Sequence, residues 1–254
     1  MLQPVVWTGK YRRLRDSPQA TPALDWAAMF SLTPFDWAAL AVFVACWAGY
    51  SAAVDRLPAL RRRSVIAAMD GHRRRWMRTM AARDNRIMDT NIIGNLMNST
   101  SFLANTAIFI LGGLVALMGS PELGARVFSA LPFAQVPDPA AWEMKIALLV
   151  VIFVRAFFDL TWALRQFNYC SIVMGGIPQG GSEAACLAGA EMAAKVANRA
   201  ARHFNTGLRA YYFGLAALGW ILHPLVLILA SLLVLRELYR REFRSVVREA
   251  LQEG

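Results

Sequence analysis

Residues 84–118 read DNRIMDTNIIGNLMNSTSFLANTAIFILGGLVALM, a long apolar segment with a ladder of polar side chains along it. Asp84, Asn91, Asn98 and Asn105 follow one another at intervals of seven residues. Because each residue turns an α-helix by roughly 100°, these side chains share one face, and Asn95 lies within about 40° of Asn91. The stretch predicts a helix with amides on one face and Ile, Leu, Phe, Val and Met elsewhere.

This helix is long and apolar enough to cross a membrane from about Ile92 to Met118. Carboxamides inside a bilayer are costly unless they face protein or a water-filled cavity. We therefore expect the amide face to point away from lipid. If it lines a polar path, the path consists of Asn91, Asn95, Asn98 and Asn105.

The composition of the whole chain is typical of an integral membrane protein, since 57% of its 254 residues are hydrophobic. We expect an all-α, multi-pass protein of the cell inner (plasma) membrane, with residues 36–254 forming one domain of about four transmembrane helices. The expected spans are residues 37–54, 92–118, 146–164 and 211–235. Residues 1–35 would form an N-terminal tail with a possible interfacial helix.

Basic residues lie mainly between the expected spans and give the chain a net charge of +10. Residues 60–86 keep a three-four apolar rhythm among their arginines, which predicts an amphipathic helix, and residues 182–208 carry an Ala-rich face. We expect both segments to be cytoplasmic helical extensions and to meet anionic lipid headgroups. No nucleic-acid module is present. The expected basic cytoplasmic face comprises Arg61, Arg62, Arg63, Arg73, Arg74 and Arg75.

The charge distribution contains a conflict about membrane topology. Loops 56–86 and 166–209 carry fourteen basic residues and should be cytoplasmic by the positive-inside rule. Four spans would then place both termini outside, although the two tails hold nine basic residues of their own.

Two further features lie within expected spans. Arg155 and Asp159 are four residues apart on one helix and predict an intramembrane ion pair, with either a structural role or a role in a conduit or switch. His223 precedes Pro224, which should kink the last span; His223 is a possible titratable group or, alternatively, a hydrogen-bonded packing residue.

Catalytic signals are missing from the sequence. His72, His203 and His223 are far apart and lack metal-ligand spacing, and no serine or cysteine lies in a nucleophile motif. The Gly-rich linker at residues 175–182 lacks the lysine of a phosphate-binding loop and predicts a flexible connector. We expect no enzyme activity, no catalytic residue, no metal and no cofactor.

Five short runs stand out along the chain: RDNRI at 83–87, IGNL at 93–96, RQFNY at 165–169, GLRAYYF at 207–213 and LYRREF at 238–243. Together they resemble an uncharacterised family of membrane proteins known as domain of unknown function 599. The resemblance covers about residue 36 onwards and implies the membrane class without an activity.

Two functions fit these observations. In the first, the chain is a homo-oligomeric channel or transporter whose amides line a polar path, with Arg155 and Asp159 as its selectivity or gating element. In the second, it is a non-catalytic structural or accessory subunit of a membrane complex, and the amides hydrogen-bond between helices. Either function implies a second copy or another membrane protein as partner.

Overall fold

The computed structural model describes residues 32–120, 122 and 139–252, and within these ranges the chain is helical and contains no strand. The expected interfacial helix of the N-terminal tail lies outside the described residues. The elements are α2 (Pro34–Val44), η2 (Ala45–Gly49), α3 (Tyr50–Arg56), α4 (Pro58–Arg61), α5 (Val65–Ala81), α6 (Ile87–Met118), α8 (Pro139–Gly175), α9 (Glu183–Leu222), α10 (Pro224–Phe243) and α11 (Val246–Gln252).

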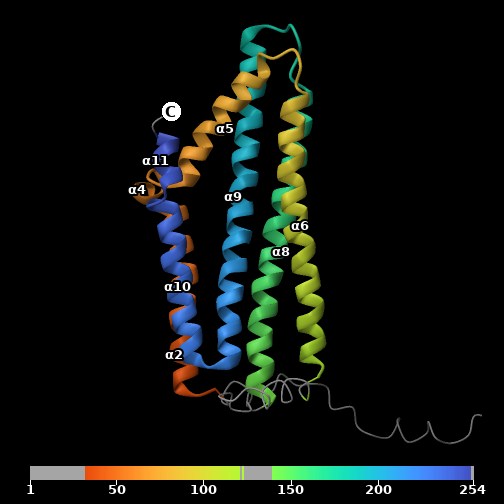
Figure 1. Ribbon diagram of the computed structural model, residues 1–254. Coiled ribbons are helices and arrows are strands. Elements are labelled where there is room, and N and C mark those ends of the chain that lie inside the picture. The colour runs from red at the N-terminus through yellow and green to blue at the C-terminus, as the bar shows by residue number, and fades with distance from the viewer. Residues whose placement is uncertain (1–31, 121, 123–138, 253–254) are drawn as a thin grey trace, which may run out of the picture.

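The long helices lie side by side as an elongated bundle (Figure 1), with α9 packed between α8, α10 and α5 and with α6 along α8. Three helical segments of the described chain are long and apolar enough to cross a membrane: Pro34–Arg56, Ile87–Met118 and Ala140–Gly175. They contain the first three expected spans. The continuous helical segment from α2 through α3 has 23 residues, while α6, α8 and α9 have 32, 37 and 40.

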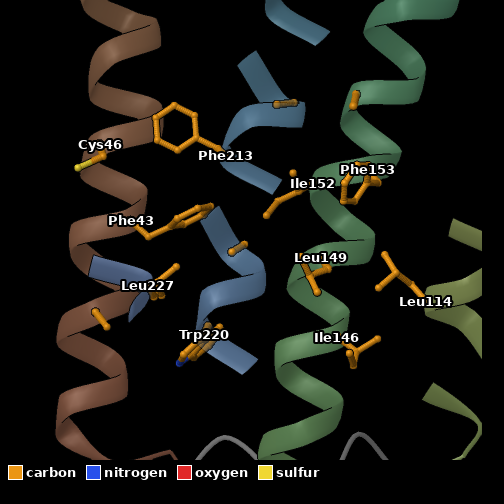
Figure 2. Close-up of a cluster of buried hydrophobic side chains, with 14 of the residues drawn as sticks. Phe43, Cys46, Leu114, Ile146, Leu149, Ile152, Phe153, Phe213, Trp220 and Leu227 are labelled. Carbon is orange, nitrogen blue, oxygen red and sulfur yellow. The ribbon is translucent and has the colours of Figure 1, made fainter. Parts of the chain in front are cut away.

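One hydrophobic core fills the end of the bundle where α2, α8 and α10 begin. Figure 2 shows Phe43 and Phe213 meeting between α2 and α9, with Ile152 and Phe153 of α8 on the other side. Gly207 and Gly214 let α9 approach α8 closely, because a Cβ on Gly207 would lie 2.7 Å from Leu160 Cγ. Bulky side chains from one helix thus pack into spaces left by small residues of the other.

A second core occupies the opposite end and is built on the Ala-rich face of α9. Ala190, Ala194 and Ala197 are buried there, as the spacing predicts, against Met77 and Met80 of α5. Ser182 caps the start of this helix, because its hydroxyl oxygen accepts a hydrogen bond from the Ala185 N–H. An Arg78–Glu191 ion pair, 2.5 Å between Nη2 and Oε1, joins α5 to α9 outside this core.

The prediction of one kinked span over residues 211–235 is wrong. Helix α9 ends at Leu222, and α10 begins at Pro224 and runs back along α9 as a helical hairpin (Figure 1). A proline within a helix removes a backbone donor, but at the first position of a helix that donor is not needed. Pro224 occupies this first position, so the apolar stretch divides into two antiparallel helices instead of bending.

Asp36 holds the base of this hairpin against the start of α2. Its carboxylate accepts hydrogen bonds from Trp220 Nε1 at 2.8 Å and from the Thr33 N–H at 3.1 Å, and Lys145 Nζ lies 4.0 Å away. Asp36 is buried, so these partners compensate the cost of removing its charge from water.

The hairpin returns the C-terminal helices to the end of the molecule that carries the Arg-rich segment (Figure 1). The Glu242 carboxylate accepts a hydrogen bond from the Ile66 N–H at 3.0 Å, and His72 Nε2 lies 3.2 Å from the Leu251 carbonyl oxygen. The basic residues of α10 therefore lie near those of α4 and α5.

We predict that Gly207→Ala destabilises the fold while Gly71→Ala does not. The added methyl group on residue 207 meets Leu160 and should cost about 1–3 kcal/mol, as overpacking does. Gly71 lies in α5 with no atom within 4 Å of a built Cβ, so alanine there should stabilise the helix by about 0.5–1 kcal/mol. The Tm of both variants, measured in detergent, tests this prediction. An equal change in Tm for the two variants would contradict the close α8–α9 packing.

Candidate functional site

Helix α6 has two distinct faces. One packs along α8 and buries Ile93, Thr100, Ala104, Ala107 and Leu114. The other face carries the amide ladder, and Asn91, Asn95, Asn98 and Asn105 are all exposed on the single chain. Where the chain is described, none of these four side chains has a hydrogen-bond partner. The predicted polar path is therefore not an internal channel of one chain; its side chains point away from the bundle.

The outer face also carries large apolar side chains and glycines. Phe102 and Phe109 are 70% and 80% exposed and lie within the arc of roughly 80° that the four amides span around the helix axis. A Cβ built on Gly94, Gly112 or Gly113 would meet no atom within 4 Å. We call the surface formed by the four asparagines, Phe102 and Phe109 the amide face.

Asp89 on the opposite side of α6 is a buried site residue that sequence reasoning missed. Its Oδ1 accepts hydrogen bonds from Trp76 Nε1 at 2.7 Å and from Arg83 Nη1 at 2.8 Å. Arg86 reaches the Ile177 carbonyl oxygen at 2.7 Å. The RDNRI run at 83–87 thus ties the α5–α6 turn to the rest of the fold, which assigns this part of the motif to structure.

The Arg155–Asp159 ion pair forms as the spacing predicts, with 2.6 Å between Arg155 Nε and Asp159 Oδ2. His203 of α9 adds a third member, since its Nδ1 lies 3.3 Å from Asp159 Oδ1. Asp159 is buried and Arg155 is exposed. The cluster joins α8 to α9, and within the described ranges no hydrogen bond links it to the amide face. Sequence spacing could not reveal His203, which is 44 residues from Asp159.

His223 has a structural role in the turn between α9 and α10. Its Nδ1 accepts a hydrogen bond from the Leu225 N–H at 3.1 Å and so caps α10, and its ring lies 6.0 Å from the ring of Phe35. This arrangement agrees with the alternative of a hydrogen-bonded packing residue.

The basic face is present except for one arginine. Arg61, Arg62, Arg63, Arg74 and Arg75 are exposed. Arg73 instead points towards α9, where its Nη1 donates to Asp70 Oδ1 at 3.1 Å and to Asn198 Oδ1 at 3.2 Å. Burial lowers the pKa of Arg73, and the Asp70 charge opposes that shift.

A basic pocket of about 330 Å³ lies where α3 and α4 meet the middle of α9. Arg61, Arg199, Arg202 and Arg209 line it, together with Asp55 and His203. Arg209 is 6% exposed; its Nη2 donates to the Asp55 carboxylate at 2.9 Å, while its Nε and Nη1 are buried without a hydrogen-bond partner in the described structure. Two features of the sequence mark Arg209: apolar residues surround it in α9, and it lies in the GLRAYYF run at 207–213.

Comparison with known proteins gives a family and no relative with a described activity. A family model described as "Protein of unknown function, DUF599" matches residues 38–247. No curated protein and no solved structure matches the chain.

We predict that Asp89→Asn destabilises the protein by about 2 kcal/mol, because it leaves Arg83 and Trp76 without their charged acceptor; the partial exposure of Arg83 keeps the loss below that of a fully buried pair. Asp84→Asn removes the same charge from an exposed side chain and serves as the control. Chemical denaturation in detergent measures the free energy of unfolding of both variants. An unchanged value for Asp89→Asn would contradict a structural role for Asp89.

Proposed function

The chain belongs to the DUF599 family, and we propose that it is a membrane protein whose copies associate through the amide face of α6 and enclose a polar path between them. One observation carries the proposal: four carboxamides on an apolar helix are exposed and have no partner within the described chain. Such side chains in a membrane require protein or water opposite them.

A second copy of the same chain is the partner that fits the spacing best. Asn91, Asn98 and Asn105 recur every seven residues, the repeat at which two helices stay in contact as a left-handed pair. An amide both donates and accepts, so it can pair with the same residue of a copy at the same depth. Parallel α6 helices from several copies would bring the amides of each level together around one axis.

Helix lengths place the amides relative to the bilayer. The 23 residues from α2 to α3 are about 35 Å long, close to the roughly 30 Å thickness of a bilayer core. The 32 residues of α6 are about 48 Å long, so its N-terminal part extends beyond the same layer. In this arrangement Asn98 and Asn105 lie within the membrane, and Asn91 and Asn95 lie at its boundary.

The same arrangement reduces the topology conflict, since of the nine basic residues in the two tails only the four of the N-terminal tail remain outside. With α9 and the hairpin-linked α10 as additional crossings, the chain crosses five times, and the C-terminal arginines join the Arg-rich segment on one side. The positive-inside rule makes that side cytoplasmic and places the N-terminal tail outside, in the inner membrane of the cell. The second core, of α5 and the adjacent ends of α6, α8 and α9, would then be the cytoplasmic extension that contacts anionic lipid.

The alternative function is a structural or accessory subunit, in which the amides serve only as helix contacts. Each interhelical hydrogen bond in a membrane contributes roughly 0.6 kcal/mol on average, so one or two would suffice for association. The amide face has four asparagines over several turns, more than association needs. That surplus favours a hydrated path.

We predict that Asn98→Leu abolishes ion flux into proteoliposomes while the oligomer persists. Loss of one amide should weaken association only about threefold, but it interrupts the path near its cytoplasmic entrance to the membrane. Asn168→Leu, an amide loss at an exposed position of α8, is the control and should leave flux unchanged. We would measure ion flux under chloride and potassium gradients together with the size of the oligomer. The two measurements distinguish a conduit from a structural subunit.

Three outcomes of this experiment have different meanings. Lost flux with an intact oligomer supports the conduit. No flux from the unaltered protein, with an oligomer that Asn98→Leu dissociates, supports the structural subunit. Unchanged flux in the variant contradicts an amide-lined path.

We predict that the two termini lie on opposite sides of the membrane. Cysteine-reactive tags at each end of the full chain, probed with an impermeant label in oriented vesicles, should show an external N-terminus and a cytoplasmic C-terminus. A C-terminal tag that is accessible from outside would contradict the hairpin as a pair of crossings.

A further inference from the structure

We propose that the basic pocket between α3, α4 and α9 is a binding site for a phosphate group, carried either by a membrane phospholipid or by a soluble molecule. The proposal is independent of the contact between α6 helices. It rests on the unmet hydrogen bonds of Arg209, on the excess of positive charge around the pocket, and on its place at the end of a membrane span.

Arg209 is the inner anchor of the proposed site. Of its three guanidinium nitrogens, Nη2 has acceptors, namely both Asp55 oxygens at 2.9 and 3.1 Å and Thr206 Oγ1 at 3.3 Å. Nε and Nη1 are buried and have none in the described part of the chain. A buried charged donor without an acceptor is costly, and a group with several acceptor oxygens would remove that cost.

The charge balance of the pocket favours an anion. Arg202 is paired with Asp70, 3.1 Å between Nη2 and Oδ2, and Arg209 is paired with Asp55. Arg61 and Arg199 have no carboxylate partner among the residues that the structure describes. Asp55, whose side chain is 49% exposed, is the acidic residue of the pocket lining, and it is paired with Arg209. The guanidinium groups of Arg61 and Arg199 therefore line the pocket without a carboxylate partner in the described chain.

The chemistry and size of the pocket favour phosphate over other anions. Guanidinium groups present paired donors that match phosphate oxygens, and several of them around one space suit a group with three or four acceptors. The volume of about 330 Å³ is at the lower end for small-molecule sites, which fits a phosphoryl group with a short substituent and not a polymer.

The position of the pocket explains why lipid is one possible source. The first span ends at Arg56, next to Asp55 in the pocket lining, so the pocket lies at the depth of the headgroups. Basic pockets between transmembrane helices at this depth bind phospholipid headgroups. A soluble phosphorylated molecule would reach the same arginines from the cytoplasm.

The test uses the purified full-length protein in neutral detergent, titrated with inorganic phosphate by calorimetry. Arg61→Gln and Arg199→Gln should each weaken phosphate binding about tenfold, the loss of one charge-assisted hydrogen bond. Within the described ranges neither side chain has a hydrogen-bond or ion-pair partner, so these variants should fold normally. Arg74→Gln, an equal charge change on the exposed face of α5, is the matched control and should bind as the unaltered chain does.

A second variant gives a change of opposite sign. Asp55→Asn removes the carboxylate that competes for Arg209, so phosphate should bind more tightly than to the unaltered chain. A general loss of folding cannot produce tighter binding, so this result separates a site from mere destabilisation.

The source of the phosphate is distinguished in nanodiscs. If a phospholipid is the ligand, phosphatidylglycerol added to phosphatidylcholine discs should raise Tm for the unaltered chain and, by a smaller amount, for Arg74→Gln, which lies on the basic face, but not for Arg199→Gln. If the ligand is soluble, inorganic phosphate should raise Tm for the unaltered chain and Arg74→Gln, but not for Arg199→Gln, in discs of phosphatidylcholine alone. Equal responses of Arg199→Gln and Arg74→Gln to both probes would overturn the proposal.

Discussion

Pro224 lacks the backbone N–H that an α-helix needs at an interior position, and the whole arrangement follows from where that residue lies. It divides the last apolar stretch after Leu222, so α10 returns along α9 and completes the core around Phe43 and Phe213. Trp220 and Asp36 lock the turn to α2 by a hydrogen bond of 2.8 Å. The same reversal carries the C-terminal arginines to the Arg-rich end of the molecule.

The two faces of helix α6 have different roles, one in the fold and one in the proposed function. Its inner side holds Asp89, whose acceptor oxygen is shared by Trp76 and Arg83, together with the apolar residues that pack on α8. Its outer side presents amides that nothing in the described chain engages. These amides are costly at membrane depth, because a single chain surrounded by lipid would leave their hydrogen-bonding groups unsatisfied. A second copy meets this requirement without any new chemistry.

Local patterns in the sequence predicted local features correctly. The all-helical class, the Ala-rich face of residues 182–208 and the Arg155–Asp159 pair all depend on spacings of three or four residues within one helix, and the structure shows each. The hairpin was not predictable, because a proline inside an apolar run signals a kink and a break alike. Periodicity assigned the asparagines to one face but could not say what lies opposite. Arg209 and Asp55 are separated by 154 residues, so only the fold brings the basic pocket together.

The claim that copies meet at the amide face is tested most directly by cross-linking. In a chain whose three free cysteines are replaced, Asn98→Cys introduces one thiol on the outer side of α6, and Leu229→Cys introduces one on an exposed part of α10. After oxidation in native membranes, we expect covalent dimers from position 98 and monomers from position 229. Monomers from position 98, or equal cross-linking at both positions, would contradict the account.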